Sequence, residues 1–339
     1  MRPGSERESR PFGIERLFQH GGDIKSAERA FPDAPRPWLD LSTGINPVPY
    51  PLPPLEPPVW TRLPEPAELQ GLQEAASARY GAAPDRIVAA PGTQALIQWL
   101  PVLFPSRRVA ILGPTYAEHE RSWRASGASV VTVSALEPGD ADAFVLVNPN
   151  NPDGRSLGRD EVLALADRMA ARKGLLVVDE AFMDFGEDSI AADPPSSAIV
   201  LRSFGKAYGL AGVRLGFAVA EAERAARIRS ALGPWPVSGA AIEIGRMALA
   251  NTAWLREARA RLQDDGAWLD AALAAAGFES AGAAPLFRLA RHPEAQSRFL
   301  RLCAAGVLTR PFPAQKTLLR FGVPRREDRP RLAEALRPL

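Results

Sequence analysis

Short runs of consecutive apolar residues recur between residues 82 and 220 of the chain. Their sequences are RIVAA, RVAIL, SVVTV, AFVLV, GLLVV, AIVLR and LGFAV, and segments with helical spacing of apolar residues separate several of them, at 93–103, 117–126 and 159–171. Strands that are apolar at consecutive positions are buried on both faces, and their alternation with helices is typical of a parallel sheet covered on both sides. The pattern therefore predicts an α/β fold with a mostly parallel central sheet.

The segments that flank this region have different patterns. Residues 1 to about 37 are polar and broken by glycine and proline, and the many prolines of 46–66 exclude regular helix. Residues 66–80 then space their apolar side chains as a helix does, and Gly81 is expected to end that helix.

The pattern changes again after the segment GPWP at 233–236. Long helices rich in alanine, arginine and leucine are predicted for about 238–276, and short apolar runs then alternate with helices near 293–304 and from about 325. We therefore predict an N-terminal arm at 1–45, a large domain at 46–230 and a smaller C-terminal α+β domain at 231–339.

Composition excludes several classes of protein. The chain has 339 residues, 46% of them hydrophobic and 24% charged, and its net charge of +2 favours no nucleic-acid partner. No apolar run approaches the ~20 residues needed to cross a membrane, and the polar N-terminus lacks an apolar targeting segment. Cys303 is the only cysteine and the three histidines are scattered, so we expect no disulfide, no metal site and a cytoplasmic location.

Lysine is rare, since only Lys25, Lys173, Lys206 and Lys316 occur among 41 basic residues. Lys206 follows the run AIVLR and lies between two glycines in the segment SFGKAYG. Burial and neighbouring cations lower the pKa of an amine, which can then attack an aldehyde. The other three lysines lie in the arm, just before a strand and in a late turn, where we expect solvated surface residues.

Two positions near strand ends are suited to phosphate. Ligands of open α/β sheets bind outside the carboxyl ends of the strands. Gly92 lets the backbone approach a ligand, and Thr93 is predicted to cap a helix whose free N–H groups favour an anion. Arg214, eight residues after Lys206, is placed to bind the same phosphate through two hydrogen bonds.

Other polar residues end two buried strands. Asp179 closes the run GLLVVD, and a buried carboxylate is costly unless it is paired, either with a protonated pyridine nitrogen or with an arginine. The segment NPNNPDG after AFVLV is a turn by composition. Its amides are also suited to a polar ring substituent, Asn148 and Asn151 more so than Asn150.

In this order along the chain, these motifs resemble those of the fold-type-I pyridoxal-phosphate (PLP) enzymes, the aspartate aminotransferase superfamily. The resemblance implies Lys206 as the Schiff-base lysine, Asp179 as the partner of the pyridinium nitrogen, Asn151 at the phenolic oxygen and Tyr116 stacked on the ring. It further implies Arg320 at the substrate carboxylate. The residues expected around the cofactor phosphate are Gly92, Thr93, Gln94, Ser203 and Arg214. For Tyr116 and Arg320, which only the resemblance singles out, the alternatives are core packing and a surface ion pair.

Two N-terminal stretches indicate which group of enzymes within this superfamily the chain resembles. With SFGKAYGLAGVRLGF, the segments HGGD at 20–23 and DLSTGINP at 40–47 are similar to the threonine-phosphate decarboxylases of cobalamin biosynthesis, near relatives of the histidinol-phosphate aminotransferases. This family is expected to convert L-threonine O-3-phosphate to CO2 and (R)-1-amino-2-propanol O-2-phosphate. An aminotransferase of the histidinol-phosphate type is the alternative, whereas a nicotinamide-dependent enzyme is disfavoured because no G-x-G-x-x-G motif follows an early strand.

The resemblance also implies substrate ligands and a homodimer. We expect Arg320 to bind one anionic group of the substrate, and His20, Gly44 and Asn46 to lie near the other. Asn151 is expected to contact the substrate as well as the cofactor. Arg310 and Arg155 are alternative phosphate ligands. Relatives often carry a Tyr before Pro that reaches the partner subunit's cofactor phosphate, whereas this chain has Leu63 there, so either the contact is missing or Tyr50 replaces it.

Overall fold

The computed structural model describes residues 14–18 and 20–337, which form two compact units. The larger unit contains 45–263 and 284–286. The smaller unit contains the described residues up to Gly44 together with 264–283 and the chain from Phe287 onwards. Residues 1–13 of the expected arm lie outside the described residues.

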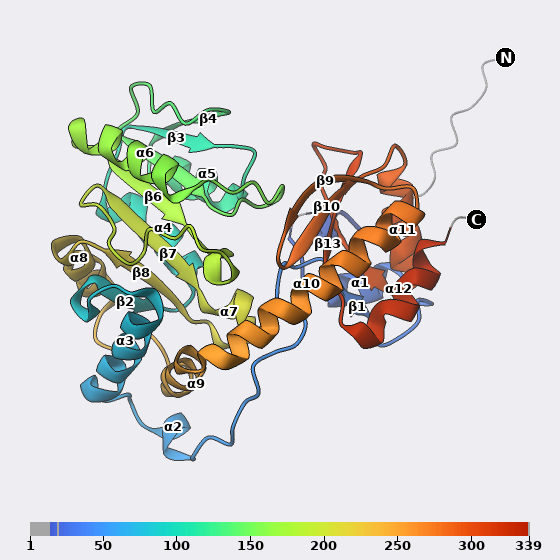
Figure 1. Cartoon of the computed structure of the whole chain (residues 1–339), viewed down its shortest axis with the longest axis horizontal. Helices are drawn as coiled ribbons and strands as arrows, with labels where there is room; N and C mark the ends of the chain where they lie inside the picture. Colours follow the sequence, from blue (N-terminus) through green and yellow to red (C-terminus); the bar gives the residue numbers. More distant parts are fainter. Residues whose placement is uncertain (1–13, 19, 338–339) are drawn as a thin grey trace. The chain divides into compact units, whose positions relative to one another are not determined.

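This division differs from the expected one at both ends of the large domain. The N-terminal segment belongs to the smaller unit because its strand β1 (Leu39–Asp40) pairs in parallel with β11 (Val307–Leu308). Residues 231–263 belong to the larger unit, where α9 (Gly239–Ala250) packs against α3 (Pro66–Tyr80). The helix α10 (Thr252–Ala275) begins in the larger unit and ends in the smaller one (Figure 1).

The seven apolar runs form the seven strands of the larger unit's sheet, as predicted. The strands are β2 (Ile87–Ala90), β3 (Arg108–Leu112), β4 (Ser129–Val133), β5 (Ala143–Val147), β6 (Leu175–Asp179), β7 (Ala198–Ser203) and β8 (Gly216–Ala220). Their order is β2-β8-β7-β6-β5-β3-β4, and β8 alone runs antiparallel to its neighbours. The predicted mostly parallel sheet is confirmed.

The helices predicted at 66–80, 93–103, 117–126 and 159–171 are present, with ends that agree to within a residue. Beside α3 and α9, the larger unit contains α2 (Pro58–Thr61), α4 (Thr93–Leu103), α5 (Ala117–Ala125), α6 (Arg159–Ala171), α7 (Phe204–Ala207) and α8 (Ala222–Leu232). The four-residue helix α2 contradicts the prediction that the prolines of 46–66 exclude regular helix. Its prolines, Pro57 and Pro58, stand at the N-cap and the first helical position, where the missing N–H of proline breaks no helical hydrogen bond. Gly81 ends α3 with a φ of 81°, a left-handed conformation that glycine adopts without strain. The short 3-10 turns are η2 (Pro84–Arg86), η3 (Met183–Phe185) and η4 (Ala211–Val213).

Helices cover both faces of this sheet. On one face α4, α5 and α8 bury side chains such as Leu96, Trp123 and Ile228 against the strands. On the other face Tyr80 of α3 packs edge-on against Phe217 of β8, at 5.7 Å between ring centroids. Each fully buried large apolar side chain contributes roughly 1.5–3 kcal/mol, so this double-sided core fixes the strand ends that carry the polar residues.

The smaller unit has a sheet of order β12-β13-β10-β9, in which β13 is antiparallel to both of its neighbours. Its strands and helices are β9 (Glu279–Ala284), β10 (Phe287–Arg291), β12 (Arg310–Pro311), β13 (Leu318–Gly322), α1 (Ile24–Ala30), α11 (Ala295–Ala304) and α12 (Arg329–Leu336), with 3-10 turns η1 (Ile14–Phe18) and η5 (Arg326–Asp328). The predicted α+β pattern of the C-terminal region is confirmed.

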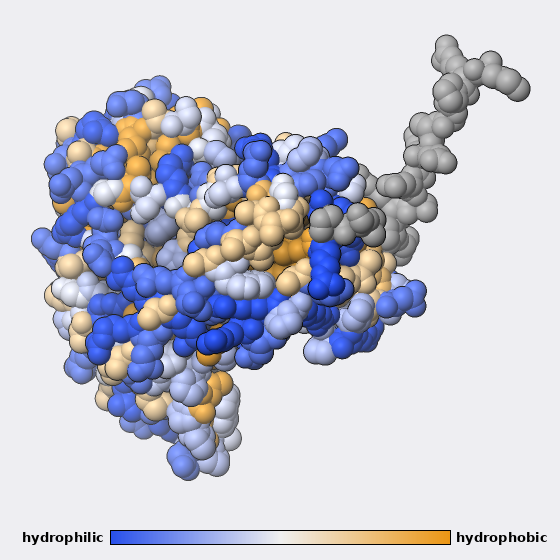
Figure 2. All heavy atoms as spheres, turned by 45° about the vertical axis from the view of Figure 1, so that its right-hand side comes forward, coloured by the Kyte–Doolittle hydropathy of each residue, from blue (hydrophilic) through white to orange (hydrophobic). Residues whose placement is uncertain are grey.

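Hydrophilic side chains dominate the face drawn in Figure 2, with hydrophobic ones interspersed. Within residues 14–18 and 20–337, every helix is too short or too polar to cross a bilayer.

Candidate active site

Asp179, the last residue of β6, is buried and held from two sides. Its Oδ2 lies 2.9 Å from Nε2 of His119, and its Oδ1 accepts a hydrogen bond from the backbone N–H of Ala181 at 3.1 Å. The partner in the described chain is therefore a histidine and not the arginine considered as an alternative. A carboxylate fixed in this way is suited to a cationic ring nitrogen, because its charge is buried and its orientation is set.

Sequence reasoning missed His119, which we treated as one of three scattered histidines. It lies in the first turn of α5, three residues after Tyr116, and is 1% exposed. The signal was its spacing, since a residue three positions after Tyr116 on a helix shares a face with it.

Tyr116 is half-buried and lies close to Asp179, His119 and Gln94. Its ring is edge-on to His119, and its hydroxyl donates to Oε1 of Gln94 at 3.1 Å. Burial, and then the charges of Glu118 and Asp179, raise the pKa of Tyr116 to about 12. The phenol is therefore protonated near neutral pH and remains a donor.

The amino end of α4 lies against a guanidinium. Gly92 has a φ of 81°, and a Cβ atom added there would lie 2.7 Å from Nη2 of Arg214. A Cβ on Gly216 would lie 2.7 Å from the backbone nitrogen of Thr93. Two glycines thus let Arg214 and the first N–H groups of α4 converge, which suits a phosphate group.

One detail of this prediction is wrong. Gly92, and not Thr93, occupies the N-cap position of α4, and Thr93 is the first helical residue. The physical reason is the close approach of Arg214 and of Gly216, which leaves no room for a side chain at the cap. The Thr93 backbone N–H and hydroxyl still lie in the first turn of the helix.

Lys206 lies in α7, directly after β7 ends at Ser203. It is half-buried, whereas Lys25, Lys173 and Lys316 are exposed, as we expected. Its Nζ lies 5.6 Å from the centroid of the Phe182 ring, a side chain that is 5% exposed. The amine therefore lies beside the buried aromatic ring of Phe182.

Asn46 holds the segment that carries Lys206. Its backbone N–H donates to the carbonyl of Lys206 at 2.9 Å, and its side-chain amide donates to the carbonyl of Ala207 at 2.8 Å. The side-chain oxygen accepts from the N–H of Val48. Both polar ends of the side chain therefore bind backbone, so Asn46 supports the position of Lys206, a role that differs from the predicted substrate contact.

Two of the three asparagines after β5 shape the turn. The amide of Asn148 bonds to the N–H and C=O of Leu157, and that of Asn150 bonds to Thr115, Pro114 and Asp153. The half-buried Asn151 remains the candidate for a cofactor contact. In the same turn, Nη2 of Arg155 is buried without a hydrogen-bond partner in the described chain.

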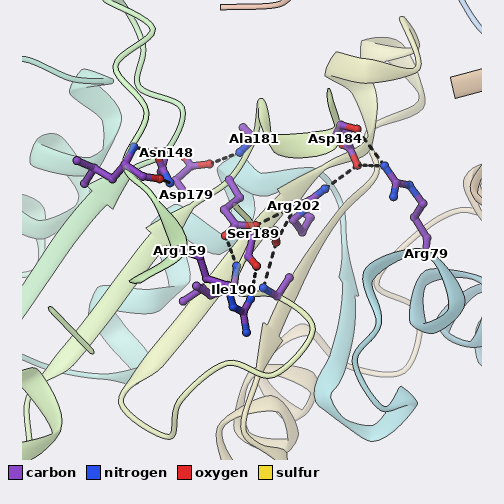
Figure 3. A network of polar contacts seen from close by, with 12 residues as sticks. Arg79, Asn148, Arg159, Asp179, Ala181, Asp184, Ser189, Ile190 and Arg202 are labelled. Carbon is purple, nitrogen blue, oxygen red and sulfur yellow. Dashed lines mark hydrogen bonds and ion pairs between the residues drawn. The ribbon is translucent and has the colours of Figure 1, made fainter. Parts of the chain in front are cut away.

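A buried ionic network supports the ends of β6 and β7 (Figure 3). Arg202 donates from Nη1 to Glu180 at 2.8 Å and from Nη2 to Asp184 at 2.7 Å, and Asp184 also accepts from Arg79. Figure 3 shows the Asp184 carboxylate between the two arginines. The Arg202 guanidinium lies 4.7 Å from the ring of Tyr80, so the network is on the α3 face of the sheet.

Two residues of the network are adjacent in the sequence to residues of the candidate site. Glu180 follows Asp179, and Arg202 precedes Ser203, so each pair points to opposite faces of the sheet. The charges balance, and those of Asp184 and Glu180 raise the pKa of Arg202 despite its burial. Sequence reasoning missed the network because no local pattern pairs an arginine with carboxylates some twenty residues away.

The smaller unit presents two arginines side by side. Arg310 and Arg320 are register partners on β12 and β13, and Nη2 of Arg320 donates to the carbonyl of Ser42 at 2.9 Å. Burial, and then the charge of Arg310, lower the pKa of Arg320. Like charges at directly opposed positions destabilise a sheet, so an anion bound here would be favourable.

The two N-terminal stretches also meet in this unit. The N–H of Gly22 donates to Oγ of Ser42 at 2.7 Å, and a Cβ on Gly21 would overlap the Ser42 carbonyl oxygen. His20 is exposed and Gly44 is buried. Because Arg320 binds the same Ser42 carbonyl, these segments and the arginine belong to one cluster.

Tyr50 does not suit the role that we considered for it. It is 8% exposed and packs edge-on against Tyr208 and Trp254, at 6.3 and 5.3 Å between ring centroids. Leu63 is 62% exposed. The tyrosine is thus a core residue of its own unit, and Leu63 stands at the surface.

Comparison with known proteins places the chain among PLP enzymes. The family model of aminotransferase class I and II matches residues 55–336. A threonine-phosphate decarboxylase from Sinorhizobium sp is 43% identical over 94% of this chain and 97% of the relative. One from Pseudomonas aeruginosa is 40% identical over 91% and 93%.

A solved structure shows the same fold. It is histidinol-phosphate aminotransferase from Sinorhizobium meliloti in complex with pyridoxal-5'-phosphate, with a TM-score of 0.82 and 21% identity, over 97% of this chain and 96% of that one.

Proposed function

The chain belongs to the aminotransferase class I and II family, and we propose that it is a PLP-dependent lyase that removes CO2 from L-threonine O-3-phosphate. The observation that carries this proposal is the 43% identity, over nearly the full length of both chains, to a relative named threonine-phosphate decarboxylase. The product would be (R)-1-amino-2-propanol O-2-phosphate, which is consumed in cobalamin biosynthesis.

The residues of the larger unit fit PLP. Asp179, oriented by His119, suits the ring nitrogen, and Lys206 suits the aldehyde. The remaining contacts that we propose are Tyr116 on the ring, Asn151 at the phenolic oxygen, and Gly92, Thr93, Gln94, Ser203 and Arg214 at the phosphate. PLP supplies an electron sink for the pair left on Cα when the carboxylate departs.

Two residues of the chain are proposed to stabilise the charge on the ring nitrogen and to supply a proton to Cα. The Asp179 carboxylate holds a proton on the ring nitrogen, because a cation beside a buried anion is stabilised. Lys206 Nζ is the group that we expect to return a proton to Cα, in place of the CO2 that leaves.

Substrate orientation decides which bond breaks, since an aminotransferase would cleave the Cα–H bond instead. We propose Arg320 and Arg310 as ligands for the anionic groups of the substrate, with His20 and Gly44 near them. Arg155 is a further phosphate ligand to test. Asn46 contributes through the position of Lys206.

One assay separates the proposal from the histidinol-phosphate aminotransferase alternative. Purified, PLP-loaded enzyme is mixed with L-threonine O-3-phosphate, and CO2 release is followed without a keto acid. We expect stoichiometric CO2 and aminopropanol phosphate. Turnover of histidinol phosphate that depends on 2-oxoglutarate, with no CO2 from threonine phosphate, would favour the alternative.

We also propose that the enzyme is a homodimer in the cytoplasm. The larger unit exposes Leu52, Trp60 and Leu63 on its proline-rich segment, at 56%, 66% and 62%, and Trp235 at 55%. Large exposed apolar side chains gathered on one segment are typical of an interface between subunits. Size-exclusion chromatography with light scattering should give twice the chain mass of 36.5 kDa.

A further inference from the structure

The smaller unit contains a pocket of about 600 Å³ that shares no residue with the candidate active site. It lies between α11, α12 and the segment at 35–36, and its volume is in the range of small-molecule sites. Phe278, Leu302 and Leu336, each 5% exposed or less, give it an apolar floor.

Arginines surround this floor. The lining contains Arg36, Arg298, Arg301, Arg331 and Arg337, and the one acid among the lining residues is Glu334. A concave surface lined by charges of one sign attracts ligands of the opposite sign.

Three of these arginines already have partners. Arg331 donates to the backbone carbonyls of Pro35 and Gly306, at 3.1 and 2.9 Å. Arg337 pairs with Glu334 at 2.9 Å, and Arg36 lies 3.7 Å from the carboxylate of Glu28. These contacts hold the walls of the pocket.

Arg298 and Arg301 differ from the other three. They are three residues apart on α11 and so share a face, where like charges repel. Within residues 20–337, no carboxylate or carbonyl accepts a hydrogen bond from either guanidinium, and the Arg298 Nε is buried without a partner. The Arg298 guanidinium lies 5.9 Å from the Phe278 ring centroid. Both arginines are half-buried, and the repulsion between their like charges on one helix face is relieved when an anion binds them.

We propose that this pocket binds a small phosphate monoester with an apolar body. Arg298 and Arg301 would bind the phosphate through charge-assisted hydrogen bonds, and the apolar body would lie against Phe278, Leu302 and Leu336. The site is separate from the proposed catalytic function and does not depend on it.

Titration calorimetry of the full-length, PLP-loaded enzyme with phenyl phosphate tests the proposal. We expect binding at this pocket to be weaker by roughly tenfold or more in Arg298→Ala and in Arg301→Gln, since each loses a hydrogen bond to a charged group. Arg326→Ala is the matched control, because Arg326 is an exposed arginine of the same unit outside the pocket, and its affinity should be unchanged. Far-UV circular dichroism and thermal melting establish that each variant is folded.

Two further comparisons locate the bound probe. Arg320→Ala should leave the affinity for phenyl phosphate unchanged, and inorganic phosphate should bind more weakly because it does not use the apolar floor. Loss of binding in Arg320→Ala with wild-type affinity in Arg298→Ala and Arg301→Gln would place the probe in the proposed catalytic site and overturn the proposal. Absence of binding to the wild type, or equal affinity for inorganic phosphate, would also contradict it.

Discussion

His119 contributes through the orientation of another side chain. Its Nε2 lies 2.9 Å from the Asp179 carboxylate, and both residues are almost fully buried. If the histidine is removed, Oδ1 of Asp179 still accepts a hydrogen bond from the backbone N–H of Ala181, but Oδ2 loses its contact with His119. The carboxylate then loses both orientation and charge stabilisation in the position that we assign to the pyridine nitrogen.

His119→Ala should therefore weaken PLP binding by roughly 10- to 100-fold, the scale of one lost hydrogen bond to a charged group. Absorbance titration of the apoenzyme with PLP measures this. His292→Asn is the control. In the wild type, Nδ1 of His292 accepts a hydrogen bond from the N–H of Glu294, and the side-chain oxygen of an asparagine can accept the same bond. Equal PLP affinity in His119→Ala and wild type would remove His119 from the account.

At the scale of elements, the glycines at the start of α4 and β8 determine what can lie beside the helix end. Gly92 and Gly216 have no room for a Cβ, because Arg214 and the Thr93 nitrogen occupy that space. A side chain at either position would push the guanidinium or the helix away from the proposed phosphate.

Gly92→Ala should lower PLP affinity at least about tenfold, which the same titration measures. Gly233→Ala is the matched control, since Gly233 has a similar backbone conformation (φ 80°, ψ −173°, against 81° and 159° at Gly92) but nothing lies within 4 Å of an added Cβ. Both variants carry similar backbone strain, so a drop in affinity confined to Gly92→Ala isolates the contact with Arg214. A similar drop in both would attribute the effect to strain.

The ionic network formed by Arg202, Glu180 and Asp184 stabilises the ends of β6 and β7. Arg202→Met leaves Glu180 and Asp184 buried without their main cation, and breaking a buried pair typically costs about 3–5 kcal/mol. The free energy of unfolding from urea titration should fall by that amount. Arg259→Met breaks an exposed pair with Glu187 and should cost at most about 1 kcal/mol. A change in Arg202→Met as small as that would show that the network contributes little.

Much of the architecture could be predicted, because consecutive apolar residues and helical periodicity are local signals. All seven strands of the larger sheet, and α3, α4 and α6, lie where the pattern placed them. Non-local pairing could not be predicted, as with β1 on β11, which joins the N-terminal segment to the smaller unit. For the same reason the sequence did not reveal the supporting roles of His119 and Arg202, or that Asn46 binds the backbone of Lys206 and Ala207.

Across the whole molecule, the residues that we propose for cofactor binding and those for substrate binding belong to different units. The residues that we assign to PLP all lie in 45–263, and the arginine pair that we assign to the substrate lies in the smaller unit. Binding of the cofactor and binding of the substrate should therefore be separable by mutation.

Arg320→Ala should raise KM for threonine phosphate by roughly 10- to 100-fold, with PLP affinity unchanged. Steady-state kinetics and the PLP titration measure the two effects. Arg320→Lys should recover only part of the loss, because an ammonium group cannot reproduce the two parallel hydrogen bonds of a guanidinium. An unchanged KM in Arg320→Ala would exclude the residue from substrate binding.

We propose that Lys206 carries the cofactor, and borohydride reduction identifies the lysine that does so. Purified enzyme is reduced in the presence of PLP and digested, and the modified peptide is identified by mass spectrometry. We expect one pyridoxyl group on Lys206 and complete loss of CO2 release. A protein that gains no label, or that is labelled at Lys25, Lys173 or Lys316 while Lys206 stays unmodified, would contradict the account.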